Sequence, residues 1–492
     1  MAKPPQPDNA TMKENELEHW LTRAAAWSAE YRRTVESRPV RAQVQPGDIS
    51  QQIAESPPRE AESMEDIFRD FEEIIPAGMT HWQHPRFFAY FQSNSAPAAF
   101  VAEVLVTAIG AQCMLWQTSP AATELEVRMI DWLRQATGLP DDFKGVLQDT
   151  ASTSTLCAIL TMREIATDFK GNEEGLFNKP PIRIYASERT HSSIDKALWI
   201  AGLGQNNLVK IATNESYAMD ADHLRNAIKA DRDNGLTPGG VVVCVGGTSI
   251  GATDNVREIC EIAKQENLYT HVDAAWAGSA MICPEYRHLW DGIELADSIV
   301  WNPHKWLGVP MECSAHFVRD PATLVKTLAI QPAYLETHGK DGIINFSEWG
   351  IALGRRFRAL KLWFLLRAYG LDGLQQRIRN HIKWSEQLAK RLRQQTDFEI
   401  VTAPMLSLFS FRYVPEQLSA LDDDTKRAKL ADLNARLLAA INDDGTIYLT
   451  QSDHDGDYVI RFVAGQFDLQ ASDIDRAFES ITALARNLPV IK

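Results

Sequence analysis

The sequence has few cysteines, and they are not clustered. Six cysteines are scattered over 492 residues without any CxxC pair. A disulfide framework belongs to short secreted chains, and a zinc site needs clustered ligands, so neither fits and no metal site is expected. Basic residues are also in deficit, since 50 Lys and Arg against 65 Asp and Glu give a net charge of −15. That balance argues against nucleic acid or an anionic membrane as the main partner.

Long hydrophobic runs are missing as well. The longest apolar stretch, residues 98–111, is interrupted by Glu103 and is too short to span a bilayer. The first ten residues are polar and rich in proline, unlike a signal peptide. Internal repeats and low-complexity tracts are absent. We therefore expect a cytoplasmic globular protein, long enough for two or three domains.

Two amphipathic helices are predicted near the N-terminus, over residues 11–36 and 63–75. Thr11 and Glu14 suit a capping box, and a linker rich in proline and glycine, residues 43–58, separates the helices. Both helices have wide apolar faces that they cannot bury by themselves. They must pack on the rest of the chain or on a second copy of it.

From about residue 95 the pattern alternates between short apolar strands and helices, which is typical of a mainly parallel sheet covered on both faces. The last part mixes strands and helices. The predicted strands are 145–148, 183–186, 208–211, 240–245, 268–272, 298–301, 406–412, 446–449 and 458–463, and the predicted helices are 120–137, 255–266, 356–369, 425–441 and 472–486. The expected division is an N-terminal helical segment (1–94), a large α/β domain (95–375) and a small α+β domain (376–492).

Polar residues follow the predicted strands where ligands bind in open α/β sheets. After strand 145–148, residues 149–154 (DTASTS) open a helix with small hydroxyl side chains. Free backbone N–H groups and the helix dipole make such a start a suitable cradle for phosphate. Taken alone the signal is weak, because Ser and Thr caps are common.

Four more strand ends carry His191, Thr248, Asp273 and Lys305. Each has a plain structural alternative: a capping histidine, a turn, a strand-end acid or a snorkelling lysine. Lys305 lies between two tryptophans in residues 301–306 (WNPHKW), where burial lowers the pKa of an amine, as an imine-forming lysine requires. A phosphate cradle, a buried acid and a desolvated lysine are together what pyridoxal 5'-phosphate (PLP) needs, with Asp273 keeping the ring nitrogen protonated.

The sequence resembles the group II PLP-dependent decarboxylases, most closely the aromatic-L-amino-acid decarboxylases. The resemblance covers nearly the whole chain and rests on residues 84–91 (HPRFFAYF), 119–126 (SPAATELE), 271–278 (HVDAAWAG), 302–307 (NPHKWL) and 353–358 (LGRRFR). It implies the type I PLP fold and a homodimer that exchanges N-terminal helices, with the active site at the subunit interface. Such an exchange would explain the two helices left without a local core.

The resemblance also implies roles for individual residues. Lys305 would hold PLP as a Schiff base, Asp273 would pair with the pyridine nitrogen, and Ala275 and His191 would cover the two faces of the ring. Thr248, together with His191, would lie near the substrate carboxylate, and Tyr334, on a loop, would protonate the carbanion left after CO2 departs. The implied phosphate contacts are Ala151, Ser152, Asn302 and His304, with a backbone contribution near Gly354 supplied by a partner subunit.

The implied substrate pocket resembles that of the family in its aromatic wall of Trp82, Tyr90 and Phe91. Gln112 and Met114 occupy positions that are usually apolar or aromatic in relatives, and Gln92 stands where relatives usually carry proline. These departures indicate either neutral change on a pocket rim or an altered ring preference. Gly354 replaces a serine frequent in tyrosine-preferring plant relatives, so an indole is permitted.

The predicted activity is decarboxylation of an aromatic L-amino acid to the arylethylamine and CO2. One alternative is an aldehyde synthase, which in relatives goes with phenylalanine at the loop position or a changed stacking histidine, whereas Tyr334 and His191 are present here. A glutamate or cysteine sulfinate substrate is disfavoured by the aromatic wall and by the lack of a matching basic patch. A non-catalytic scaffold is disfavoured by the complete set of Lys305, Asp273, His191 and Tyr334.

Overall fold

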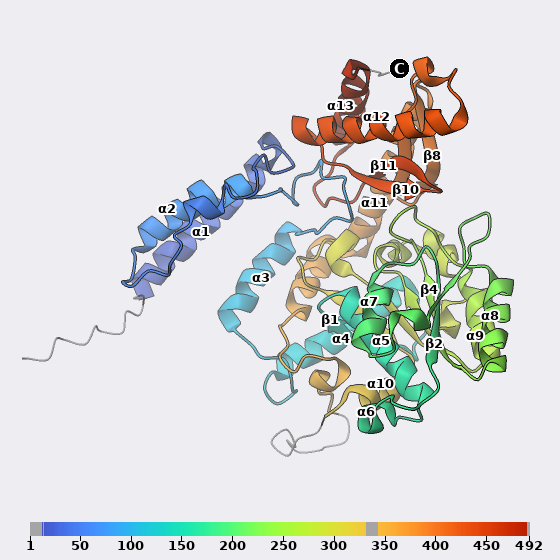
Figure 1. Cartoon of the computed structure of the whole chain (residues 1–492). Helices are drawn as coiled ribbons and strands as arrows, with labels where there is room; N and C mark the ends of the chain where they lie inside the picture. The colour runs from blue at the N-terminus through green and yellow to red at the C-terminus, as the bar shows by residue number, and fades with distance from the viewer. Residues whose placement is uncertain (1–11, 13, 331–342, 490–492) are drawn as a thin grey trace, which may run out of the picture.

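The computed structural model describes residue 12, residues 14–330 and residues 343–489. Within these ranges the chain forms a seven-stranded sheet, a four-stranded sheet and an N-terminal pair of helices (Figure 1). The α-helices are α1 Glu14–Thr34, α2 Met64–Ile74, α3 Pro97–Ile109, α4 Pro120–Thr137, α5 Ala151–Ala166, α6 Gly171–Glu174, α7 Ser193–Ile200, α8 Ala221–Asp233, α9 Val256–Gln265, α10 Pro321–Leu328, α11 Ala359–Arg393, α12 Asp423–Asp444 and α13 Ala471–Asn487.

The large sheet has the strand order β1-β7-β6-β5-β4-β2-β3. Its strands are β1 Lys144–Gln148, β2 Ile182–Ser187, β3 Leu208–Ile211, β4 Thr237–Cys244, β5 Tyr269–Asp273, β6 Ser298–Trp301 and β7 Ser314–Val318. Every pairing is parallel except the two made by β7. The prediction of a mainly parallel sheet is therefore confirmed, and β7 is the strand that the sequence pattern did not reveal.

Helices cover both faces of the large sheet, as the side chains of β4 demonstrate. Val241 and Val243 belong to the main core cluster, together with residues of α8 and α9 such as Leu224 and Ile259. Val242 points the other way, into a cluster with residues of α5 and α7 such as Met162. Because successive side chains of a strand alternate between faces, this arrangement buries β4 on both sides.

The small sheet is antiparallel, with the order β10-β11-β9-β8. Its strands are β8 Phe398–Met405, β9 Leu408–Tyr413, β10 Thr450–His454 and β11 Asp457–Val463. Helices α12 and α13 and the last turns of α11 cover it, with Leu388, Leu437 and Ile481 in one core. Helix α11 begins three residues later than predicted and continues to Arg393, with a kink at Gly370 (φ 63°).

The predicted strand at 446–449 is wrong, because tertiary contacts occupy its backbone. The side chain of Asn442 binds both the N–H and the C=O of Leu449. Tyr448 instead pairs with the segment of Phe87, donating to Arg86 O and accepting from Phe88 N. The strand of the small sheet therefore begins only at Thr450.

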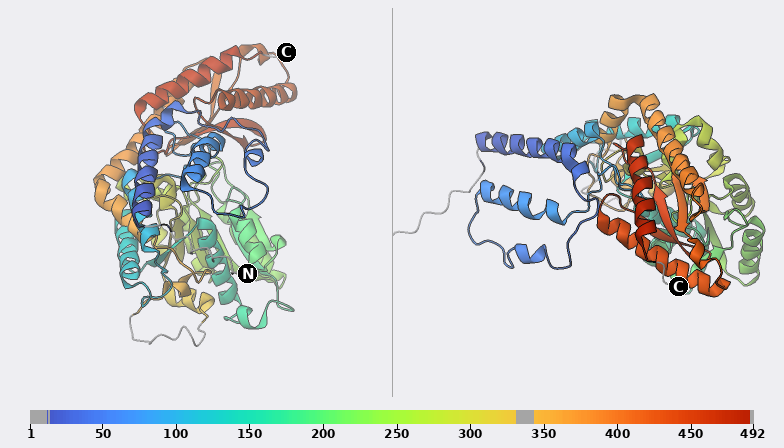
Figure 2. Two further views of the ribbon diagram at one scale, coloured as in Figure 1. Left: turned by 90° about the vertical axis from the view of Figure 1, so that its left-hand side faces the viewer. Right: turned by 90° about the horizontal axis from the view of Figure 1, so that it is seen from above.

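Helices α1 and α2 pack side by side and project from the body of the chain (Figures 1 and 2). Trp27 contacts Phe71 with ring centroids 4.7 Å apart, and the side chain of Ser63 caps α2 by accepting a hydrogen bond from Asp66 N. Leu17, Leu21 and Ile67 nevertheless remain exposed. The proposed partner of Glu14 in a capping box, Thr11, lies outside the described residues.

Candidate active site

A cavity of about 190 Å³ lies where the strands of the large sheet end. It is lined by residues that follow β1, β2, β4, β5 and β6, because the carboxyl ends of parallel strands meet at one edge of a sheet. The lining residues are Phe91, Thr150, Ala151, Ser152, His191, Ser193, Cys244, Gly246, Gly247, Thr248, Asp273, Ala275, Trp276, Asn302, His304, Lys305 and Met311. Nine of the residues predicted from strand ends, and Phe91 of the predicted aromatic wall, thus share one cavity.

The N-terminus of α5 forms the anion-binding side of the cavity. Thr150 caps the helix by accepting a hydrogen bond from Thr153 N, and the first helical bond runs from Ser154 N to Thr150 O. The N–H groups of Ala151 and Ser152 precede that bond, so the helix itself does not use them. Two unpaired donors at a positive helix end favour a phosphate group.

His304 and Asn302 face the same end of the cavity. The Nδ1 atom of His304 accepts a hydrogen bond of 3.0 Å from Cys313 N, so the neutral ring carries its proton on Nε2. Burial is the main cause that lowers the pKa of His304 to about 3, and nearby Lys305 adds to it. Asn302 Oδ1 is buried without a hydrogen-bond partner among the described residues. Each side chain therefore keeps a polar atom, Asn302 Oδ1 or His304 Nε2, that forms no hydrogen bond with a described residue.

Lys305 projects from a π-helical turn, η8 Pro303–Leu307, and its carbonyl accepts a 2.6 Å hydrogen bond from Asn94 Nδ2. Its Nζ lies 5.0 Å from the centroid of the Phe91 ring, which stacks on Trp276 at 4.8 Å. Burial lowers the pKa of Lys305 to about 8, Asp273 opposes this shift, and Arg461 adds to it. The lowered pKa gives this amine a larger neutral, nucleophilic fraction at physiological pH than an exposed lysine has.

Asp273 ends β5 as a buried carboxylate. Its Oδ1 accepts a 3.0 Å hydrogen bond from the N–H of Ala275, which fixes the side chain beside the cavity. Gly246 (φ 77°), at the end of the neighbouring β4, approaches Ala277 so closely that a Cβ would lie 2.5 Å from it. A side chain there would displace the wall that carries Asp273 and Ala275.

His191 lies at the mouth of the cavity. Its Nδ1 accepts a hydrogen bond of 3.1 Å from Ser193 N, so the neutral ring keeps its proton on Nε2. Desolvation by the cavity wall lowers the pKa of His191, Asp273 opposes the shift, and Lys305 strengthens it. The ring is therefore poised as a neutral N–H donor beside Lys305 and Asp273.

Several predicted residues lie outside this cavity. Trp82 and Tyr90 stack on each other at 6.1 Å on the surface, and Gln112 accepts a hydrogen bond from Arg355 N beside Gly354. Met114 is likewise not part of the cavity wall. Tyr334 falls outside the described residues.

Gln92 is not on a pocket rim, which corrects the expectation from the sequence. Its side chain is buried, and Nε2 donates to Phe87 O at 3.1 Å and to Val463 O at 2.8 Å. Gln92 thus fastens the segment that carries Phe91 to strand β11 of the small sheet.

The sequence analysis missed Arg461, which lies behind Phe91. This arginine in β11 is only 4% exposed, and its Cζ lies 4.7 Å from the centroid of the Phe91 ring. None of the ion pairs among the described residues involves Arg461. Its Nη2 donates to Tyr90 O at 2.7 Å, its Nε has no hydrogen-bond partner, and burial lowers its pKa to about 10. The signal that could have identified it is the presence of a charged residue within the apolar strand 458–463.

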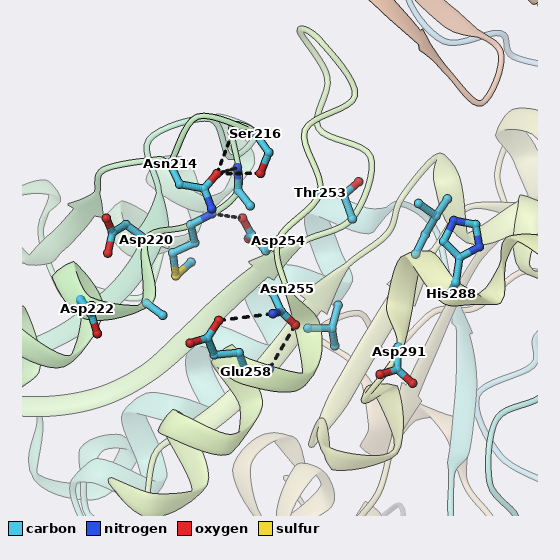
Figure 3. A pocket seen from close by; sticks show the side chains of 15 residues that line it. Asn214, Ser216, Asp220, Asp222, Thr253, Asp254, Asn255, Glu258, His288 and Asp291 are labelled. Atoms are coloured by element: carbon cyan, nitrogen blue, oxygen red, sulfur yellow. Dashed lines mark hydrogen bonds between the residues drawn. The ribbon is translucent and has the colours of Figure 1, made fainter.

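A larger cavity, of about 580 Å³, lies elsewhere on the chain (Figure 3). Its polar side chains are engaged with neighbours: Asn255 caps α9, Asp220 caps α8, and Asp254 accepts hydrogen bonds from Met219 N and Cys244 N. It contains none of the predicted site residues. The smaller cavity is therefore the candidate active site.

None of the described helices combines the length and the hydrophobicity that a membrane span requires. All six cysteines are buried free thiols.

Comparison with known proteins agrees with this geometry. Residues 46–414 match the family model described as the pyridoxal-dependent decarboxylase conserved domain. Tryptophan decarboxylase 2 of Oryza sativa subsp. japonica is 38% identical over 461 residues, covering 92% of this chain and 90% of the relative. Tyrosine/DOPA decarboxylase 1 of Papaver somniferum is 38% identical over 454 residues, covering 89% and 87%.

Solved structures are similar over almost the full length. The crystal structure of Oryza sativa TDC with PLP and tryptamine has a TM-score of 0.91 at 33% identity, covering 98% of this chain and 99% of that one. The structure of Rhodiola rosea 4-hydroxyphenylacetaldehyde synthase has a TM-score of 0.89 at 30% identity, covering 98% and 100%.

In the cofactor-free protein, we predict that Lys305 titrates near pH 8, because its surroundings are poorly solvated. The Arg461→Gln variant removes a nearby positive charge and should move the midpoint upward. The measurement is the pH dependence of an amine-modifying reagent, read by mass spectrometry on the peptide that contains Lys305, with exposed lysines of the same digest as reference. A midpoint equal to that of the reference lysines contradicts the prediction.

Proposed function

The chain belongs to the pyridoxal-dependent decarboxylases, and we propose that its candidate site removes the carboxyl group of an aromatic L-amino acid, releasing CO2 and the arylethylamine. The observation that carries the proposal is the convergence of Lys305, Asp273 and the free amides of α5 in one cavity. The relatives that act on tryptophan, tyrosine or DOPA support the aromatic class of substrate.

The residues present fit PLP, the cofactor of this family. Lys305 would bind its aldehyde, and Asp273 would face its ring nitrogen. The Ala151 and Ser152 amides, with the side-chain N–H groups of Asn302 and the Nε2 proton of His304, would donate hydrogen bonds to its phosphate. Once bound, the cofactor supplies an electron-accepting ring for the electrons of the breaking Cα–carboxylate bond. The carboxylate of Asp273 would favour a proton on the ring nitrogen, which would make the ring a better electron acceptor.

The protein must also orient the substrate so that the bond to the carboxylate is the one that breaks. At the cavity mouth, His191 would donate a hydrogen bond from Nε2 to the substrate carboxylate, and the hydroxyl of Thr248 would lie near the same group. Arg461 contributes positive potential behind Phe91, and a buried cation without a counter-ion favours an anionic substrate nearby. Phe91, Trp276 and Met311 supply apolar surface for the substrate's ring.

The test of this function is kcat/KM for decarboxylation of Trp, Phe, Tyr and DOPA, with glutamate as a non-aromatic comparison. Lys305→Ala should abolish turnover and the imine absorbance, because the amine that binds the cofactor is gone, whereas Lys264→Ala, at an exposed position of α9, should keep both. Borohydride trapping and peptide mapping should label Lys305. Turnover of glutamate alone, or a label on another lysine, contradicts the proposal.

We also propose that the active protein is a homodimer with exchanged N-terminal helices. Val101, Val104, Leu105 and Ile109 form an exposed apolar stripe along one face of α3, and α1 and α2 leave further apolar surface uncovered. Stripes of this size are rarely left to solvent. Three predicted site residues lie outside the cavity of the single chain and would then act across the interface: Gln112, Met114 and Gly354.

Sedimentation should therefore give twice the mass of the chain. Leu105→Asp places a charge in the stripe and should dissociate the dimer, with loss of activity. Phe177→Ser is the matched control, because Phe177 is 88% exposed and remote in sequence from this stripe, and it should leave the dimer intact. A monomeric, fully active wild type contradicts the proposal.

The alternative product is an aldehyde, as the printed name of the Rhodiola rosea structure indicates for that protein. After CO2 leaves, the former Cα must receive a proton before oxygen reaches it. A phenol can deliver that proton and phenylalanine cannot, so we assign this step to Tyr334, whose position lies outside the described residues.

Tyr334→Phe should lose about 10²–10⁴-fold in amine formation. It should gain oxygen-dependent release of aldehyde, ammonia and peroxide. Product analysis by mass spectrometry, with and without oxygen, decides the matter. If the variant still makes mainly amine near the wild-type rate, the proton donor is another residue, and His191 becomes the next candidate. If the wild type itself makes aldehyde, the chain is an aldehyde synthase.

A cytoplasmic location and the division of the chain at residues 94 and 375 also stay proposals. The location is supported by the buried free thiols, and the division by the separate cores of the two sheets.

A further inference from the structure

The hairpin turn between β10 and β11 reaches from the small sheet to the large domain (Figure 1). Asp455 and Gly456, at its tip, both have positive φ, of 53° and 83°, which is typical of a tight two-residue hairpin turn. Arg427 braces the turn from α12, donating to Asp455 O at 2.8 Å and to Asp457 Oδ1 at 2.7 Å. The carboxylate of Asp455 is thus presented on a rigid support.

Both oxygens of Asp455 bind residues of the large domain. Oδ1 accepts a 2.6 Å hydrogen bond from Arg189 Nη2, and Oδ2 accepts a 2.8 Å hydrogen bond from Tyr217 OH. The guanidinium of Arg189 also lies over the Tyr217 ring, 5.2 Å from its centroid. Arg189 and Tyr217 come from different loops, after β2 and β3, and Asp455 joins them.

Arg189 stands two residues before His191 in the loop that follows β2. Its backbone N–H binds Ser187 Oγ, and its carbonyl packs against the loop after β4, where a Cβ on Gly247 would lie 3.4 Å from Arg189 O. Thr248 is the next residue of that second loop, which is closed by a 2.7 Å hydrogen bond from Gly247 N to Ala252 O. Arg189 therefore touches both loops that carry polar groups to the cavity mouth.

A second contact from the small sheet reaches the same loop. Gly251 (φ 77°) packs on Met405 of β8, and a Cβ at Gly251 would lie 3.0 Å from Met405 Cβ. The loops of His191 and Thr248 are thus contacted by two independent elements of the small sheet, the hairpin turn and β8.

We propose that Asp455 is a positioning residue for the reaction: through Arg189 it holds the His191 loop and the Thr248 loop at the distance from the cofactor site that catalysis requires. The ion pair is partly exposed, with side chains 21% (Arg189) and 52% (Asp455) accessible, so it adds little to overall stability. Small displacements of reacting groups, in contrast, cost rate steeply. The inference rests on the proposed placement of His191 and Thr248 in the active site.

The experiment compares Asp455→Asn, Arg189→Gln and the double variant, as full-length holoenzymes, with wild type. Each single variant should lower kcat about tenfold. The Kd of PLP and the melting temperature should stay unchanged, because the groups that would hold the phosphate and Lys305 lie on other strand ends. The circular dichroism of bound PLP should change, since His191 moves relative to it. The double variant should be no slower than either single one, and Asp455→Glu should keep most of the activity.

Glu399→Gln is the matched control. It removes a similarly exposed carboxylate whose partner, Arg412, lies within the small sheet, so it should keep wild-type kcat. The inference is overturned if Asp455→Asn has wild-type kcat, loses no more than Glu399→Gln, loses activity only in proportion to lost PLP, or is additive with Arg189→Gln. A wild type that decarboxylates no aromatic amino acid would instead refute the proposed function, which is a separate outcome.

Discussion

Burying an amine without a bonded counter-ion is unfavourable, and the surroundings of Lys305 are organised around that cost. Phe91 and the stacked Trp276 and Trp306 rings, 5.1 Å apart, exclude water from its side of the cavity. Asp273 limits the penalty, while Arg461 increases it from behind Phe91. The balance leaves Lys305 with a pKa of about 8, well below that of an exposed lysine.

That environment needs a rigid frame, which the parallel sheet provides. Strands β4, β5 and β6 are buried on both faces and end at the same edge, so Asp273 and Lys305 are fixed relative to each other and to the start of α5. The short π-helical turn that carries Lys305 is in turn held by Asn94, whose side chain binds both Lys305 O and Gly465 O. Asn94 therefore links Lys305 to the segment that follows β11, although the small sheet contributes no strand to the cavity edge.

Other parts of the cavity wall are also held by contacts with distant segments of the chain. Gln92 ties the Phe91 segment to β11, Arg461 stands behind Phe91, and Asp455 reaches the His191 loop. These contacts are polar and specific, and each joins segments more than 250 residues apart.

The sequence by itself determined the features that depend on local pattern. Apolar strands followed by polar residues predicted the cavity edge, and the Ser and Thr residues at the start of α5, Asp273 and Lys305 were found because each lies directly at a strand end. Only the tertiary structure decided the rest. Residues 446–449 resemble a strand, but Asn442 and the Phe87 segment take their backbone groups. Arg461 and Asp455 approach the site from the small domain, and Asn94 approaches it from the N-terminal segment. Only the fold shows that Gln92 is buried, whereas Trp82 and Tyr90 lie at the surface of the single chain. The physical reason is that propensity and spacing act over a few residues, whereas burial and electrostatic surroundings come from contacts between distant parts of the chain.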